Sequence, residues 1–117
     1  RRTQRMTGGR RGDVILVGFM FTDESGWSIR RAVVISSSAY HRARQQVVVA
    51  AITSKIGRHL FGDHLLADWK GAGLLFPSVV TGIIRTIKQT MIHRKLGTLA
   101  KSDLEAVGRE HRRFLGL

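Results

Sequence analysis

Arg30, Arg31 and Thr53 stand at the ends of two apolar stretches, each of which predicts a buried strand. The arginines come directly before residues 32–35, and Thr53 follows the run 47–52. A guanidinium group binds two phosphate oxygens at once and stays charged. A hydroxyl group can hold a phosphate oxygen or orient an attacking hydroxyl. A cation at one strand's start and a hydroxyl at another's end could therefore promote attack of an RNA 2′-hydroxyl on its own phosphate.

Both residue types also have ordinary structural explanations. Arginines often extend past strand ends into water, and threonine is common in strands. Neighbouring side chains in a strand point to opposite faces, so Arg30 and Arg31 are not expected to serve the same site. The residues alone do not decide which of the two is functional.

The apolar pattern predicts a chain built mainly from short strands. Strands are expected at 13–21, 31–36 and 46–54, a short strand followed by a turn at 65–75, and two apolar pieces at 78–87 with a bulge at Gly82. A closing helix is indicated by a capping box of Ser102 and Glu105 and by apolar spacing after it. The fold class is mainly β with short helices (α+β), as a small antiparallel barrel or strongly coiled sheet with a C-terminal helix.

Composition narrows the function classes. The 117 residues suit one domain, with 1–10 as a basic flexible arm and 11–117 as the folded unit. Twenty Lys and Arg against eight Asp and Glu give a net charge of +12, which favours a polyanionic partner. There is no cysteine, no apolar run of transmembrane length and no apolar signal segment, so a cytoplasmic protein fits best.

Several common kinds of site are absent from the sequence. It has no phosphate-binding glycine motif and no paired histidine spacing, and without cysteine a structural zinc is disfavoured. We therefore expect no metal and no cofactor. His59 and His64 flank a short loop and are read as loop histidines rather than as a general base.

Five stretches in order resemble one known family. They are RRGDVILVGFMFTDESG, RRAVVIS, VVVAAITS, DHLLADWKGAGLLFPSVV and KLGTLAKSDLEAV, and together they span roughly residues 10–115. The chain resembles the MazF/PemK toxins of bacterial toxin–antitoxin pairs, which act as mRNA interferases. The resemblance implies an SH3-like β-barrel, a homodimer with a groove at its interface, and metal-independent cleavage of single-stranded RNA that leaves a cyclic phosphate and a 5′-hydroxyl. It also implies a MazE-like antitoxin with an acidic disordered segment, DNA contact only through the antitoxin complex, and no membrane.

The resemblance assigns roles to residues of this sequence. The family's catalytic arginine precedes a proline, which places it at Arg30 with Arg31 in the proline position, and its catalytic threonine corresponds to Thr53. An Arg and Asp pair that takes part in cleavage in some members is missing at Thr81 and Gly82. Trp27 is expected either to stack on a base or to be a half-buried loop residue. The RNA contacts expected beside the catalytic pair are Thr22, Trp27, Ser54, Lys55 and Arg85.

Two other functions stay open from the residues. One is a CcdB-like toxin without nuclease activity that acts on DNA gyrase, and the other is a non-catalytic RNA-binding module of SH3-like fold. The presence of both Arg30 and Thr53 disfavours the gyrase toxin, which needs neither. A simple RNA binder would show strong salt dependence and form no product.

Overall fold

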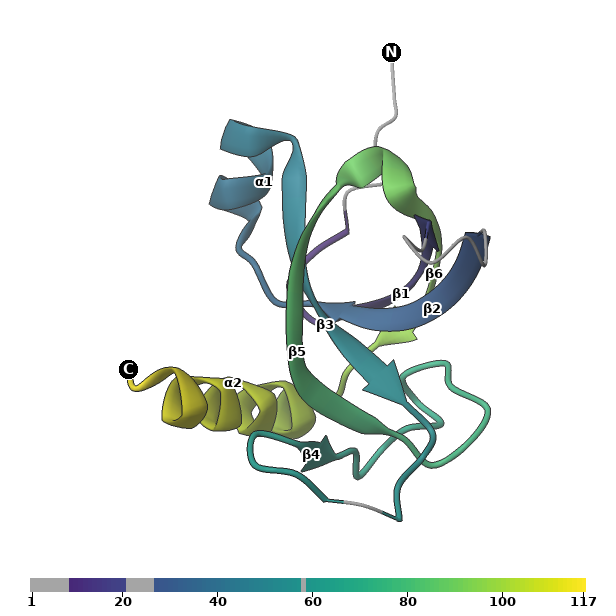
Figure 1. Cartoon of the computed structure of the whole chain (residues 1–117), viewed down its shortest axis with the longest axis vertical. Helices are drawn as coiled ribbons and strands as arrows, with labels where there is room; N and C mark the ends of the chain where they lie inside the picture. The colour runs from purple at the N-terminus through teal and green to yellow at the C-terminus, as the bar shows by residue number, and fades with distance from the viewer. Residues whose placement is uncertain (1–8, 21–26, 58) are drawn as a thin grey trace.

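The computed structural model describes residues 9–20, 27–57 and 59–117 (Figure 1). These ranges hold six strands, two α-helices and one short 3-10 helix. The elements are β1 (Asp13–Met20), β2 (Trp27–Val34), α1 (Ser38–Arg44), β3 (Gln46–Thr53), β4 (His64–Leu65), β5 (Val79–Lys88), η2 (Gln89–Met91), β6 (Ile92–Thr98) and α2 (Lys101–Leu115). No helix within these ranges has the length and apolarity needed to span a membrane.

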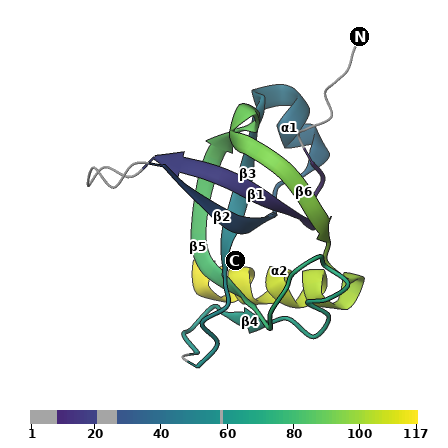
Figure 2. The ribbon, with the colours of Figure 1, turned by 90° about the vertical axis from the view of Figure 1, so that its right-hand side faces the viewer.

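All six strands belong to one antiparallel sheet in the order β4-β5-β3-β2-β1-β6. The sheet curls strongly, and η2 joins β5 to β6 across one end of the curl while α2 lies beneath the other end (Figures 1 and 2). The predicted fold class, a coiled antiparallel barrel with a C-terminal helix, is confirmed.

The curled sheet has a core on each of its faces. Val47 and Val49 of β3 pack inside the curl with Ile15 and Val17 of β1. Ala50, with Ile52, belongs to the second core, which includes Val107 of α2. Because strand residues alternate between faces, an unbroken apolar run such as that of β3 supplies both cores.

The predicted elements agree with the structure except at their boundaries and at one helix cap. β2 begins four residues earlier than expected, at Trp27, and ends at Val34. The expected bulge at Gly82 is confirmed, because the β3–β5 register shifts between the pairs Ala50–Ile84 and Ile52–Val80. The capping box of Ser102 and Glu105 is wrong: α2 begins at Lys101, and its N-cap residue forms no side-chain cap hydrogen bond.

Asp103 joins the start of α2 to the segment after β4. Its carboxylate is 2% exposed and accepts hydrogen bonds from the backbone N–H of Ala67 and of Asp68, each at 3.0 Å, and it lies 2.8 Å from Nε2 of His64. Burial raises the pKa of Asp103, but the hydrogen bonds from Ala67, His64 and Asp68 outweigh this effect and hold the pKa below its ordinary value. The buried carboxylate of Asp103, rather than the expected capping box, thus fixes the start of α2 to the segment after β4.

Candidate functional site

A cavity of about 270 Å³ opens between β2, β3 and β5. Three arginines line it, Arg30 and Arg31 from β2 and Arg85 from β5, and among the described residues no carboxylate does. The rest of its wall is apolar and consists of Ala32, Val49, Ala51, Ile52 and Ile83. Cations on an apolar surface interact with an anion more strongly than the same cations in open water, because the local dielectric constant is lower.

The pairing of β1 with β2 sets the directions of the two neighbouring arginines. Arg30 lies opposite Val17, whose side chain is in the core inside the curl, and Arg31 lies opposite Leu16. The two arginines therefore lie on opposite faces of β2, as alternation predicts. Arg30 is exposed and Arg31 is half-buried, and both contribute to the cavity wall.

Thr53 ends β3, as expected, near this cavity but outside its wall. The last pair between β2 and β3 is Ala32–Ala51, and Arg30 and Thr53 each lie two residues beyond it, so the register places them on the same face. Thr53 Oγ1 accepts a hydrogen bond from the backbone N–H of Lys55 at 3.1 Å. Its own O–H has no acceptor among the described residues and can donate to a ligand.

The bulge in β5 brings Ile83 and Arg85 to the cavity. The Thr81 hydroxyl donates to the carbonyl of Ala51 at 2.8 Å and accepts from the N–H of Ile83 at 3.1 Å, which fixes the irregular turn of the strand. Ile83 is 62% exposed, an unusual position for a large apolar side chain in a strand. Thr81 therefore has a structural role at the position where some family members carry a cleavage residue.

Helix α2 supports the same bulge from below. Nε2 of buried His111 donates to the carbonyl of Thr81 at 3.1 Å, and the Phe114 ring packs against Gly82, where a Cβ would lie 3.0 Å from a ring carbon. Burial lowers the pKa of His111, and Arg11 adds to this, while the Thr81 carbonyl and Glu110 act in the opposite direction. His111 is thus held neutral as part of the support for β5.

The lowered pKa of His111 predicts acid sensitivity near neutral pH. The unfolded chain binds a proton near pH 6.5, whereas the folded chain binds it only at lower pH, so the free energy of unfolding is expected to fall as the pH drops below about 7. His41, whose pKa is lowered chiefly by burial, adds to the same trend. Urea titrations between pH 8 and pH 5.5 measure this slope, and His111→Gln should make it shallower. An equal slope in both proteins would contradict the assignment to His111.

The remaining predicted contacts divide into two groups. Ser54 and Lys55 are exposed directly after Thr53, but neither lines the cavity. Thr22 lies outside the described residues, and only the backbone of Trp27 is described. The sequence analysis did not identify Ile83. Because Ile83 lies two residues before Arg85 in a strand, alternation puts the two side chains on the same face.

No metal-binding cluster is present in the described ranges. Nowhere in them do three or more His, Asp or Glu side chains come close enough to hold an ion. The functional groups at the cavity of Arg30 are guanidinium groups and, beside it, the hydroxyl of Thr53. Groups of these kinds can bind a phosphodiester and stabilise added negative charge.

Solved structures of similar fold are numerous. An endoribonuclease in complex with its cognate antitoxin from a mycobacterial species is 18% identical, with a TM-score of 0.74 over 93% of this chain and 96% of that one. A MazE–MazF complex from Deinococcus radiodurans is 18% identical, with a TM-score of 0.77 over 94% and 97% of the two chains. The Mycobacterium tuberculosis toxin MazF-mt6 is 22% identical, with a TM-score of 0.73 over 90% and 97%. At these identities the likeness establishes the fold.

The sequence itself establishes the family. No curated protein matches it. The model of the PemK-like, MazF-like toxins of type II toxin–antitoxin systems matches residues 10–115, which is nearly the whole chain. The chain therefore belongs to the PemK-like, MazF-like toxin family of type II toxin–antitoxin systems.

Proposed function

We propose that this toxin is a metal-independent endoribonuclease that cleaves single-stranded RNA at the cavity lined by Arg30 and Arg85. The observation that carries the proposal is that Arg30 and Arg85 line one cavity with apolar walls, beside the donor O–H of Thr53. Structures of similar fold that are described as endoribonucleases support the same activity.

The proposed step is attack of a ribose 2′-oxygen on the adjacent phosphorus. The 2′-hydroxyl releases its proton as the O2′–P bond forms, the P–O5′ bond breaks, and the leaving 5′-oxygen takes up a proton. The upstream fragment then ends in a 2′,3′-cyclic phosphate, and the downstream fragment begins with a 5′-hydroxyl. Arg30 would bind the non-bridging oxygens as their charge increases, with Arg85 as a second cation on the same cavity. Thr53 would donate to a phosphate oxygen or orient the 2′-hydroxyl.

A homodimer and an antitoxin complete the proposal. Apolar side chains of the β4 region, the β5 bulge and the end of α2 are exposed, namely Phe61, Leu65, Ile83 and Leu115. Arg113 lies over the Phe61 ring at 4.9 Å, and Phe114 packs on Gly82, so these segments form one surface. We assign the dimer contact to this surface, next to the cavity.

A cytoplasmic antitoxin with an acidic disordered segment would suit the chain's charge of +12, as the antitoxin-bound relatives suggest.

Cleavage in the presence of EDTA tests the proposed activity. The purified protein should cut a long unstructured RNA at a small set of sites with the chelator present. RNA binding without any cleavage product would contradict the proposed nuclease activity and would favour the non-catalytic RNA-binding module. Gyrase capture without RNA cleavage would favour the gyrase toxin.

Thr53→Val tests the role assigned to the hydroxyl. The change keeps the branched shape but removes the O–H donor, and we expect kcat for cleavage to fall about 100- to 1,000-fold, the scale of a single lost transition-state hydrogen bond. Thr86→Val is the matched control, because it makes the same change at an exposed strand threonine outside the cavity wall, and it should change kcat less than about threefold. Equal losses in the two variants would contradict the role of Thr53.

A further inference from the structure

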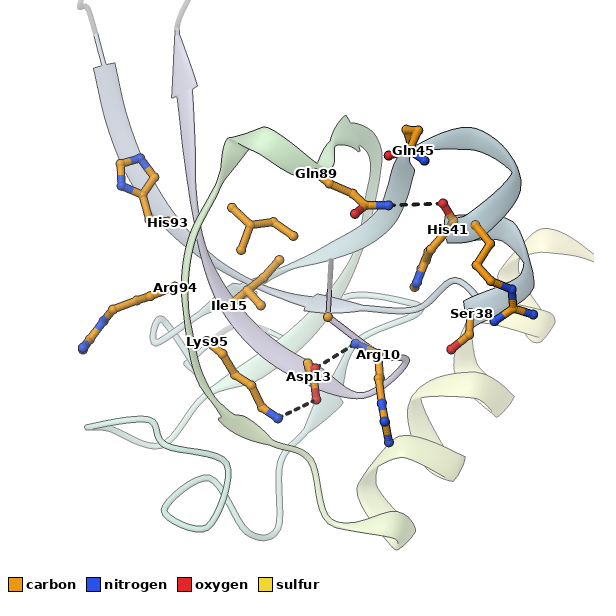
Figure 3. A pocket seen from close by; sticks show the side chains of 13 residues that line it. Arg10, Asp13, Ile15, Ser38, His41, Gln45, Gln89, His93, Arg94 and Lys95 are labelled. Carbon is orange, nitrogen blue, oxygen red and sulfur yellow. Dashed lines mark hydrogen bonds and ion pairs between the residues drawn. The ribbon is translucent and has the colours of Figure 1, made fainter. Parts of the chain in front are cut away.

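A second, larger cavity lies between α1, β1 and β6 (Figure 3). Its volume is about 910 Å³, and it shares no lining residue with the cavity of Arg30. Its described lining carries four permanent cations, Arg10, Arg42, Arg94 and Lys95, against one carboxylate, Asp13. The excess of positive charge indicates an anionic ligand.

Asp13 does not offset these cations equally. Its carboxylate accepts from the Arg10 backbone N–H at 2.7 Å and from the Thr98 hydroxyl at 3.1 Å, and it lies 3.3 Å from Nζ of Lys95. Figure 3 shows Lys95 turned toward Asp13 and Arg94 directed away from the cavity. The guanidinium groups of Arg10 and Arg42 have no carboxylate partner among the described residues.

His41 adds a buried donor to the wall of this cavity. It is 7% exposed, and its Nε2 lies 2.6 Å from the hydroxyl of Ser36. Ser36 Oγ accepts from the N–H of Val48 at 2.8 Å and can donate its own O–H to Nε2. In that arrangement the ring proton of neutral His41 is on Nδ1. Nδ1 is buried and has no hydrogen bond of standard geometry within the described residues, and the Gly9 carbonyl acts on the ring through a weaker contact.

The same imidazole is kept neutral by its surroundings. Burial lowers the pKa of His41, and this effect outweighs the opposing one of the Gly9 carbonyl. On the side of α1, the Gln89 amide donates to the backbone carbonyl of His41 at 3.2 Å, which ties η2 to the helix. His41 is therefore fixed by one contact to its ring, from Ser36, and by one to its backbone carbonyl, from Gln89.

Apolar side chains complete the cavity. Ile15 is fully buried and Ile92 is half-buried, and both line it beside the polar groups. A nucleotide would present a phosphate to the arginines and the planar face of its base to half-buried Ile92. The volume lies near the upper end of the roughly 300–1,000 Å³ typical of ligand pockets.

We propose that this cavity is a second nucleotide subsite, which holds a phosphodiester of the single-stranded RNA away from the cavity of Arg30 through Arg10, Arg42 and Nδ1–H of His41. The identification of the ligand as RNA rests on the proposed function, whereas the binding of phosphate at this cavity does not depend on that function.

The imidazole nitrogens of His41 report directly on this subsite. Nitrogen–proton NMR of the full chain should show the Nδ1–H tautomer, and inorganic phosphate should shift the Nδ1 signal saturably. A single-stranded 2′-O-methyl RNA, which cannot be cleaved, should shift the same signal and compete with phosphate. His41→Ala would also remove the contact to Ser36 and disturb the fold, so the arginines are the better residues to change.

The double variant Arg10→Gln with Arg42→Gln should weaken phosphate binding at least tenfold. It should also lower the salt dependence of RNA binding by about 1.4 logarithmic units per decade, for two lost single-strand phosphate contacts. Arg109→Gln, an exposed arginine on α2, is the matched control and should leave phosphate binding within about twofold of the unchanged protein.

The outcomes separate this inference from the proposed function. A His41 signal that phosphate and RNA leave unchanged overturns the subsite even if the toxin cleaves RNA. Phosphate binding that poly-glutamate displaces but RNA does not overturns the assignment to RNA. A shift by both probes in a protein that cuts no RNA would support the subsite and remove only the nuclease proposal.

Discussion

Replacing Arg30 with alanine is expected to lower the rate of RNA cleavage by about 10³-fold, the scale seen when a charged group that stabilises a phosphoryl transition state is removed. Arg30 lies on the face of β2 that continues into the core inside the curl, and it lines the cavity together with Arg85. Its fork can bind two phosphate oxygens as their charge increases. Single-turnover cleavage of one labelled RNA, with enzyme in excess, measures the effect on the chemical step.

Arg31→Pro is the informative comparison for Arg30→Ala. The family resemblance puts Arg31 at the position of the family's proline, and Arg31 lies on the other face of β2, opposite Leu16. The variant Arg31→Pro should therefore lose far less cleavage activity than Arg30→Ala. Circular dichroism checks that both variants fold. Comparable losses would mean that the assignment of the catalytic arginine is shifted by one residue.

Replacing Asp103 with alanine is expected to cost about 3 kcal/mol of folding free energy. The change leaves the N–H groups of Ala67 and Asp68 without acceptors and removes the partner of His64. Urea unfolding at pH 7 measures this loss. Asp63→Ala is a useful control, since it also removes a buried loop carboxylate but one that, within the described ranges, accepts only the N–H of nearby Leu60. A loss no larger in Asp103→Ala than in Asp63→Ala would contradict the anchoring role.

The lowered pKa of Asp103 adds a dependence on pH to that prediction. Since the folded chain holds the carboxylate ionised to lower pH than the unfolded chain does, its stabilisation is present above about pH 4 and is lost as the pH falls through the folded value. Asp103→Asn should remove this component while it keeps the side chain's shape. An unchanged acid limb of the stability curve in Asp103→Asn would contradict the assignment.

The strands could be predicted from sequence because their signal is local. The apolar runs at β1 and β3 are bounded by polar or turn residues, and the break at Gly82 correctly indicated the bulge in β5. The N-terminal half of β2 was missed because Ser28 and Arg30 are polar there. That half of the strand pairs with β1 alone, at the open edge of the cavity.

What could not be predicted depends on contacts between distant residues. Asp103 was missed because its partners lie 35 to 39 residues away, and a local capping box was inferred in its place. The tautomer of His41 depends on Ser36 and, through it, on Val48 of the next strand. Arg30 and Thr53 were selected by residue type and family resemblance, and only the strand register places them on one face.

The chemical ends of the RNA products test the central claim most directly. Mass spectrometry of fragments made by the wild-type toxin in EDTA should find a 2′,3′-cyclic phosphate on each upstream fragment and a 5′-hydroxyl on each downstream fragment. An RNA with a single 2′-deoxy sugar at the cleavage site should stay intact there. A 5′-phosphate on the downstream fragment, or cutting at the deoxy position, would show that the 2′-hydroxyl is not the nucleophile and would contradict the proposed chemistry of Arg30 and Thr53.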